Sequence, residues 1–148
     1  MRTFIEDAVK NFFHETLSVR CETYGKFPPL KVYSAIITLS DESTKYSFSL
    51  CMSNATIKLI SNILLYEDQP DEEIKTDLVC ECANLIVGSA KVAIEAANEG
   101  KLLQLSPPEY QGYFEEEFTK VFEDKLYFKV HDELIMIGVE SVDITATV

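Results

Sequence analysis

The chain has 148 residues, 47% of them hydrophobic and 26% charged, which is the composition of one ordinary globular domain spanning residues 1–148. Its 13 basic and 25 acidic residues give a net charge of −12, which makes nucleic acids and anionic membrane surfaces poor partners. Acidic residues interrupt the apolar start of the chain, and charges interrupt its longest apolar stretch, so we expect neither an export signal nor a membrane span. A soluble cytoplasmic protein is the expectation.

The first third of the chain predicts one helix followed by two strands. Residues 3–19 carry apolar side chains at mostly helical spacing, and Gly25 with the Pro28-Pro29 pair is expected to end this helix. Two strands follow, joined by a turn at residues 41–44. In the second strand, residues 45–52, polar and apolar side chains alternate, which is the period of a strand with one buried face.

Two helices are predicted in the middle of the chain. Ser53 or Asn54 can cap the first, because a short polar side chain accepts a hydrogen bond from the backbone of the first turn. Pro70 and the three acidic residues after it suit the entry of the second helix, since proline fixes φ and acids favour the positive end of the helix dipole. This longest helix is expected to run over residues 71–98, with Gly100 ending it.

The last third of the chain predicts mainly strands. A short strand within residues 102–105 precedes Pro107-Pro108, and residues 126–130 and 134–139 are expected to form a hairpin at the C-terminal end. Residues 109–125 are acidic and aromatic, and the sequence leaves open whether they pack on the core or bind a partner. The order of elements favours an α+β fold with an antiparallel-rich sheet and helices packed on one face.

The cysteines and histidines do not indicate a metal site or a nucleophile. The cysteines are Cys21, Cys51, Cys80 and Cys82. They include no CxxC pair and have no nearby histidine ligands, so buried free thiols in a reducing cytosol are expected, and no metal site is predicted. His14 falls in the first helix and His131 in the turn of the hairpin, and spacing suggests no serine or cysteine partner for either.

The long helix has a polar and an apolar side. At about 100° per residue, a sector of about 80° contains Asp77, Glu81, Asn84, Gly88, Lys91 and Glu95. The other side contains Val79, Cys82, Ala83, Ile86, Ala90, Ala93 and Ala97. The apolar side is expected to pack on the core, and the polar side is expected to face solvent or a partner.

Three features of the polar side are unfavourable in a helix that meets only water. Asp77 and Glu81 are like charges four residues apart, which costs about 0.2–0.5 kcal/mol, and Gly88 costs about 1 kcal/mol relative to alanine. Asn84 is a mediocre helix former. A plain solvated face is one interpretation, whereas a face that another backbone approaches closely would account for these three features.

The spacing of these residues resembles a family signature. Asp77, Glu81, Asn84 and Pro107, with 22 residues between the last two, match every fixed position of the D/S-x3-E-x2-N-x22-P signature of the CheC/CheX family of chemotaxis phosphatases. The resemblance extends to the order of two strands, a short helix and the signature helix over residues 32–107, and to the terminal hairpin. The single copy of the signature resembles CheX rather than CheC, which carries two.

The resemblance implies an activity, a partner and roles for particular residues. The substrate would be the aspartyl phosphate of a CheY-like response regulator, whose receiver domain supplies Mg²⁺ and a lysine, so no cofactor of the chain's own is expected. Asn84 would orient the attacking water, because a carboxamide can accept from water and donate to a phosphoryl oxygen at once. Glu81 would pair with the receiver lysine, and Asp77, Gly88 and Lys91 would dock the partner.

Two other functions stay open on the sequence, together with the oligomeric state. A catalytically silent CheX-like module would bind a receiver domain without hydrolysing anything, and a structural component that has kept the fold would bind none. CheX-like relatives pair, and the terminal hairpin would offer an apolar edge that a monomer must protect, so a homodimer is expected.

Overall fold

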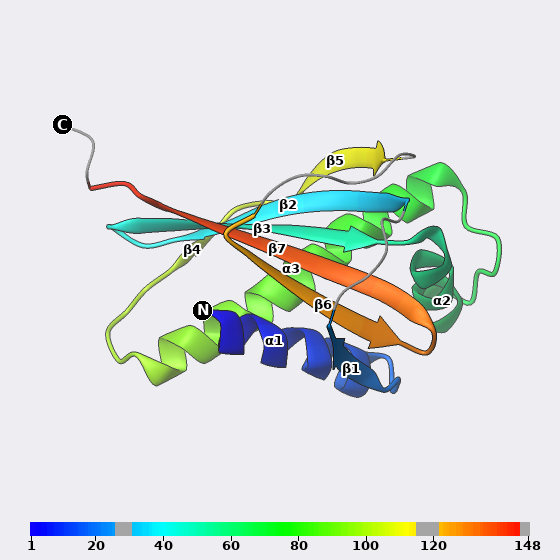
Figure 1. Ribbon diagram of the computed structural model, residues 1–148, viewed down its shortest axis with the longest axis horizontal. Helices are drawn as coiled ribbons and strands as arrows, with labels where there is room; N and C mark the ends of the chain where they lie inside the picture. Colours follow the sequence, from blue (N-terminus) through cyan, green and yellow to red (C-terminus); the bar gives the residue numbers. More distant parts are fainter. Residues whose placement is uncertain (26–30, 115–121, 146–148) are drawn as a thin grey trace.

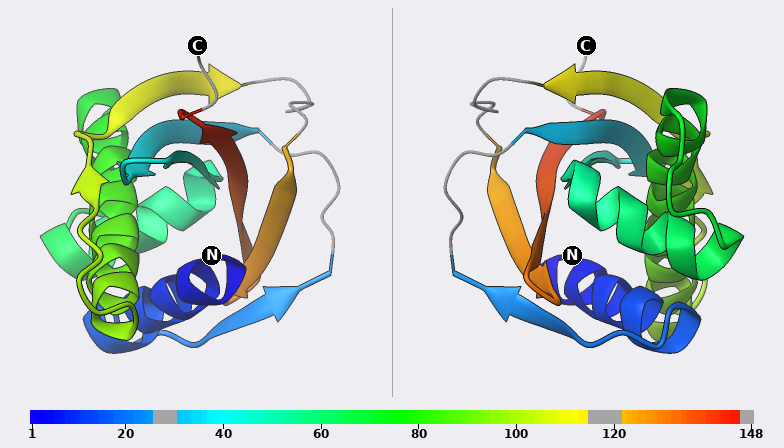
Figure 2. Two further views of the ribbon diagram at one scale, coloured as in Figure 1. Left: turned by 90° about the vertical axis from the view of Figure 1, so that its left-hand side faces the viewer. Right: turned by 90° about the vertical axis from the view of Figure 1, so that its right-hand side faces the viewer.

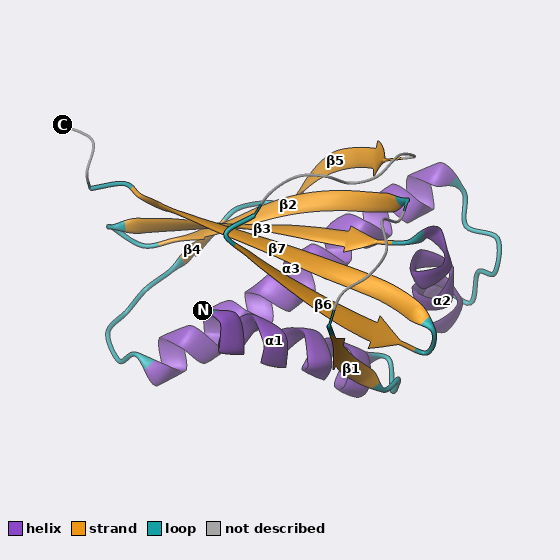
Figure 3. Cartoon of the chain, viewed as in Figure 1, coloured by secondary structure: helices purple, strands orange, loops and turns teal. Residues whose placement is uncertain are grey.

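The computed structural model describes residues 1–25, 31–114 and 122–145 (Figure 1). The helical elements are α1 (Arg2–Asn11), the π-helical turn η1 (Phe12–Thr16), α2 (Asn54–Leu65) and α3 (Glu72–Ala97). The strands are β1 (Cys21–Tyr24), β2 (Val32–Ser40), β3 (Thr44–Met52), β4 (Gln104–Leu105), β5 (Glu109–Phe114), β6 (Asp124–Val130) and β7 (Glu133–Asp143). The helices lie together on one side of the sheet (Figure 3), which confirms the predicted α+β class.

The strands form one antiparallel sheet in the order β1-β6-β7-β3-β2-β4. The outer side of β2 is shared, because β4 pairs with the end of β2 and β5 pairs with its beginning. Figure 2 shows the sheet curving around the helices, so its concave side and the helices enclose the core. The predicted pair of β2 with β3 and the predicted terminal hairpin of β6 with β7 are both confirmed.

Alternation along the strands builds the core. Phe48, Leu50 and Met52 of β3 are each 3% exposed or less, and β6 and β7 contribute side chains in the same way. Burying one such side chain stabilises the fold by about 1.5–3 kcal/mol relative to leaving it in water. Ser49 and Cys51, which lie between them, are buried as well, so β3 has both faces covered near its end, and the expectation of one buried face holds only for its first half.

Side-chain caps set where α2 and α3 begin. The Ser53 hydroxyl accepts a hydrogen bond from the Thr56 amide at 3.2 Å, and the Asp71 carboxylate accepts one from the Ile74 amide at 2.9 Å. Each cap of this kind stabilises a helix by about 1 kcal/mol. Both caps fall where the sequence predicted helix starts, and Gly100, with φ of +84°, follows the end of α3 as expected.

The structure corrects the expectations for the edges of the sheet. The first helix is shorter than residues 3–19, because α1 ends at Asn11 and η1 continues only to Thr16. Two strands were not predicted: β1, which pairs with β6, and β5, which shows that residues 109–114 belong to the sheet. The Pro28-Pro29 pair and residues 115–121 lie outside the described residues.

The terminal hairpin lies inside the sheet over most of its length. Residues 127–130 of β6 pair with β1, and β7 lies between β6 and β3. The expectation that this hairpin offers an apolar edge is therefore wrong over the residues that pair with β1, a short polar strand from the N-terminal part of the chain. The outermost strands of the described sheet are β1 on one side, and β4 and β5 on the other.

None of the helices in the described part of the chain is both long enough and apolar enough to span a membrane.

Candidate functional site

The long helix α3 carries the motif, and its packing decides which motif side chains are accessible. It packs against β2 and α1, and it runs along the helical side of the sheet (Figure 2). The residues that it buries are Leu78, Val79, Cys82, Ala83, Ile86, Val87, Ala90 and Ile94. Most of the predicted apolar side is therefore confirmed.

Ala93 and Ala97 were placed on the core side by the sequence, and both are exposed. Ile94, which is 3% exposed, is the last buried residue of α3. The last turn of the helix therefore extends past the core.

Asp77 and Glu81 lie one turn apart on the outer face of α3, and both are exposed. Neither pairs with a cation among the described residues, although the chain has cations on neighbouring turns of the same helix. Two unpaired carboxylates one turn apart repel each other slightly. A partner that brings a cation to this face would relieve that repulsion and gain a charge-assisted hydrogen bond.

Asn84 follows Glu81 by three residues, so the two side chains lie on adjacent turns of the same face. Asn84 is half-buried rather than fully exposed as expected, because the segment that returns along α3 covers one flank of the helix. Its carboxamide makes no hydrogen bond within the described residues. It therefore keeps both a donor and an acceptor for a ligand at the edge of the exposed face.

The segment after α3 covers the flank that carries Gly88, Lys91 and Glu95. A Cβ added at Gly88 would lie 3.7 Å from Cδ2 of Leu105, an ordinary contact distance. Lys91 Nζ lies 3.0 Å from Glu95 Oε1, and Glu95 Oε2 accepts a hydrogen bond from the Leu103 amide at 3.0 Å. This amide hydrogen bond, with the Lys91 ammonium, lowers the pKa of Glu95. Lys91 is thus already paired with Glu95, and Glu95 in turn binds the backbone of the returning segment.

The distance in sequence between Asn84 and Pro107 has a structural explanation. After α3 the chain turns back and forms β4 on the outer side of β2, beside the helix (Figures 1 and 2). Ser106 then completes this pairing, since its hydroxyl accepts from the Thr38 amide at 2.9 Å and its amide donates to the Thr38 carbonyl at 3.0 Å. Pro107 is the next residue. The 22 residues between Asn84 and Pro107 are therefore the rest of α3 and the segment that returns to β2.

A group of aromatic residues anchors the first turns of α3 and was not predicted. The hydroxyl of Tyr33, on β2, lies 2.9 and 3.0 Å from the two carboxylate oxygens of Glu72. Burial, together with this hydrogen bond to Glu72, raises the pKa of Tyr33. The Tyr33 ring also packs against the ring of Tyr113, on β5, at 4.5 Å between centroids. No sequence pattern joins these residues, because β5 was not expected.

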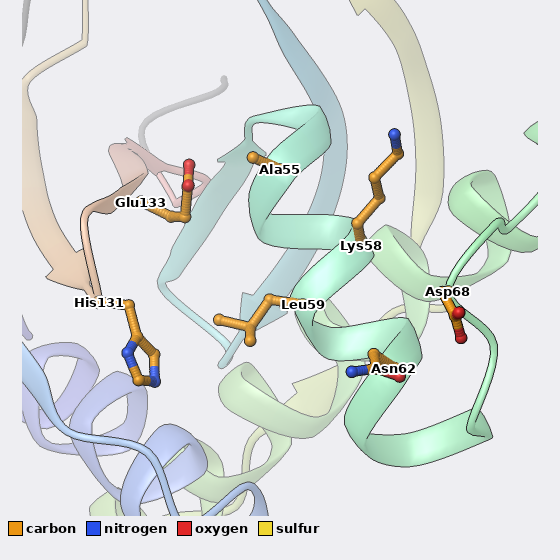
Figure 4. Close-up of a pocket in the computed structure, with 7 residues that line it drawn as sticks. All are labelled: Ala55, Lys58, Leu59, Asn62, Asp68, His131 and Glu133. Atoms are coloured by element: carbon orange, nitrogen blue, oxygen red, sulfur yellow. The ribbon is translucent and has the colours of Figure 1, made fainter.

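A polar recess lies beside His131 (Figure 4). It lies between α2 and the turn from β6 to β7, with a volume of about 330 Å³. Figure 4 shows that its polar side chains do not converge, since Lys58 points away from His131 and Glu133. His14 is exposed on η1.

The four cysteines are free thiols, as predicted, although only Cys51 and Cys82 are buried and the other two are half-buried. Burial raises the pKa of Cys21 to about 11 and the pKa of Cys82 to about 12, so these thiols stay protonated at neutral pH and are poor nucleophiles. Within the described ranges, no three His, Cys, Asp or Glu side chains are grouped as a metal site requires.

Comparisons with known proteins give the family. The family model described as "Chemotaxis phosphatase CheX" matches residues 33–117, which is more than half of the chain and includes the whole motif. No curated protein sequence matches the chain.

Several solved structures share the fold. The chemotaxis protein CheX from Vibrio vulnificus is 17% identical, with 95% of each chain covered and a TM-score of 0.79. A CheC-like superfamily protein from Shewanella is 21% identical over 95% of this chain and 96% of the other, with a TM-score of 0.72. A CheX–CheY–BeF₃–Mg²⁺ complex from Borrelia burgdorferi contains a chain 16% identical, with 94% and 96% covered and a TM-score of 0.69. With the family-model match, they lead to one conclusion: this chain belongs to the CheX family of chemotaxis phosphatases.

Proposed function

We propose that this protein hydrolyses the aspartyl phosphate of a CheY-like response regulator, using Glu81 and Asn84. One observation carries the proposal: Glu81 and Asn84 lie on adjacent turns of one accessible helix face, and neither side chain has a partner within the described structure. The family and the CheX–CheY complex from Borrelia burgdorferi support the choice of a CheY-like partner.

The proposed reaction is the attack of one water molecule on phosphorus. The bond between phosphorus and the aspartyl oxygen breaks, the aspartate carboxylate leaves, and both hydrogens of the water remain on the inorganic phosphate. The amide oxygen of Asn84 accepts a hydrogen bond from the water while the amide NH₂ donates to a phosphoryl oxygen, and this holds the water in line with the departing oxygen. Catalysis by orientation suits phosphoryl transfer, in which the protein has little covalent chemistry to perform.

Glu81 is proposed to fix the partner rather than to move a proton. Its carboxylate would pair with a lysine of the receiver domain, and Asn84 then reaches the phosphoryl group because it lies one turn further along α3. In this proposal Mg²⁺ belongs to the receiver domain, and this chain contributes no metal ligand. Asp77 and Gly88 lie within one or two turns of this pair and are proposed to meet the partner's surface. Lys91 would do so only after leaving Glu95.

The test is the decay of a phosphorylated receiver domain with and without this protein, repeated for each receiver domain of the host. Hydrolysis predicts faster loss of phosphate from at least one receiver, with multiple turnovers per molecule of the protein. A module that only binds would change complex formation and leave the decay rate unchanged. A purely structural component would not bind a receiver domain at all.

A further inference from the structure

The outer face of α3 changes character after Asn84. Leu85 is 42% exposed and Val92 is 65% exposed, although both are large apolar residues. Ser89, Ala93 and Ala96, the other outward residues of this stretch, are also exposed and uncharged. A helix face that meets only water usually carries charged side chains. We call Leu85, Ser89, Val92, Ala93 and Ala96 the apolar stripe.

A recess adjoins the apolar stripe on its α1 side. Leu85 and Ser89 form one wall, and residues of α1 and η1, including Asn11, Phe12 and Glu15, form the other. Its volume is about 390 Å³, which is room for a large side chain of another protein. Asn11 and Glu15 are exposed and give the recess a polar rim, whereas Phe12 is only 5% exposed and gives it an apolar floor.

We propose that the apolar stripe and this recess are the docking surface for the receiver domain, supplying affinity where Glu81 and Asn84 supply chemistry. This inference rests on the proposed function. At 1.5 Å rise per residue, Val92 lies about 12 Å along the helix from Asn84, and Leu85 is its neighbour. A specific partner covers about 800 Å² of surface, so a domain that brings its phosphoryl group to Asn84 also covers both residues.

The chemistry of the surface specifies what the receiver must present. One end, at Asp77 and Glu81, is acidic and accepts a cation, and the other end accepts apolar side chains. This division matches interfaces in which a few buried apolar anchors carry most of the affinity and charged residues set orientation. The receiver therefore needs a basic group near its phosphorylation site and an apolar side chain about 10–15 Å away, a separation set by the helix rise.

A second copy of this chain is a poorer occupant of the same surface. A second copy brings no excess of cations to Asp77 and Glu81, because each chain carries a net charge of −12. It would also cover Asn84. The receiver domain has neither disadvantage, because it approaches this face with a cation.

The experiment compares two identical substitutions on different elements. Val92→Asp changes the apolar stripe, and Val142→Asp is its control, because Val142 lies on β7 and is 58% exposed. Each variant is titrated against a receiver domain loaded with beryllofluoride and Mg²⁺, and its phosphatase rate is measured against the concentration of phosphorylated receiver. Val92→Asp should raise both the dissociation constant and the half-saturation concentration about tenfold or more, with a maximal rate within about twofold of wild type. Val142→Asp should change neither.

Two further variants separate the loss of apolar contact from the effect of added charge as causes of weaker receiver binding. Val92→Ser and Leu85→Ser remove apolar surface without adding charge, so their weakening should persist at high salt, which screens the contribution of Glu81. Thermal unfolding identifies any variant that fails to fold, and the variants that do fold then test the docking surface.

Each outcome of these measurements leads to one conclusion. Wild-type affinity in Val92→Asp, Val92→Ser and Leu85→Ser would overturn the docking surface while leaving the proposed function intact. Conversion of a free dimer into a monomer by Val92→Asp would show that a second copy occupies the stripe, which also overturns it. A wild-type protein that binds the loaded receiver without accelerating phosphate loss would overturn the proposed function alone, and one that binds no receiver would overturn both.

Discussion

Asn84 and Glu81 differ in surroundings, and this difference separates their expected effects. Asn84 is half-buried at the edge of the exposed face, whereas Glu81 is exposed at its centre. Asn84→Ala should lower the maximal rate of stimulated dephosphorylation by about 10²–10³-fold, because one preorganised polar group is lost. The fold should be unaffected, since Asn84 makes no side-chain hydrogen bond among the described residues. Phosphate release under saturating receiver is the measurement, and a rate near wild type would refute the assignment.

Glu81 is expected to affect binding first. Glu81→Ala should leave a receiver lysine without its partner at a desolvated site, which costs about 2–5 kcal/mol of binding free energy. The half-saturation concentration should rise and the maximal rate should fall, unlike Asn84→Ala, which mainly lowers the maximal rate. Glu81→Gln keeps the size and an acceptor, so it should recover part of the loss and bind with a weaker salt dependence. Wild-type behaviour of Glu81→Ala would favour a plain solvated face.

Asp41 is a residue whose charge matters for stability rather than for activity. Its carboxylate accepts from the Ser43 and Thr44 amides, each at 2.8 Å, and lies 3.4 Å from Lys101 Nζ. These hydrogen bonds, the one from Ser43 first, lower the pKa of Asp41 from 3.8 to about 2. A carboxyl whose pKa is lower in the folded state contributes stability above its unfolded pKa and loses it as pH falls through the folded value.

Urea unfolding of wild type and Asp41→Asn checks this contribution. The wild type should be the more stable at neutral pH, and the difference should be constant down to about pH 5 and then shrink as pH falls through 3.8 toward 2. A difference that does not change with pH would mean that the turn needs the shape of the side chain and not its charge.

At the scale of elements, α3 combines an accessible face, the proposed catalytic face, with a flank that another segment covers. Glu95 joins the two, because it binds Lys91 on its own helix and the Leu103 amide on the returning segment. This arrangement holds β4 beside α3. Lys91, which the sequence suggested for docking, has this internal role in the structure whether or not it also meets a partner.

Gly88 gives a prediction that separates folding from docking. An added Cβ would have ordinary contact with Leu105, so Gly88→Ala should fit and should stabilise α3 by up to about 1 kcal/mol. If Gly88 is present so that a partner backbone can approach, the same change should weaken receiver binding. Chemical denaturation and receiver titration of this one variant test both halves. Higher stability with unchanged binding would remove Gly88 from the docking surface.

At the scale of the whole molecule, a homodimer is still predicted, but through different strands from the ones that the sequence suggested. The terminal hairpin is inside the sheet where β1 pairs with residues 127–130, so a second copy could pair there only if β1 were displaced. The outermost described strands, β1 and β4 with β5, are the places where a second copy could add to the sheet. Sedimentation at micromolar concentration should show a species of twice the 16.8 kDa chain mass. A species at the chain mass alone would contradict the dimer.

The sequence by itself determined what depends on local periodicity and local hydrogen bonds. Alternation in β3 and β6, the cap at Ser53 and the two-sided pattern of α3 each involve residues within a few positions of one another, and each was predicted correctly in outline. The entry of α3 was predicted at the right place, although the cap is Asp71 and Pro70 lies before the helix. The motif is of the same kind, because Asp77, Glu81 and Asn84 share a face through helix geometry alone. Their chemical roles came from the family resemblance and not from periodicity.

Only the tertiary structure decided what depends on which segments become neighbours. The short strands β1 and β5 have little pattern of their own, and they exist because β6 and β2 offer free backbone groups to them. The hydrogen bond from the Leu103 amide to Glu95 and the recess between α3 and α1 both follow from such long-range contacts. Leu85 and Val92 lie outside the apolar side that helix periodicity predicted, and the structure shows that both are exposed, next to the recess in the case of Leu85.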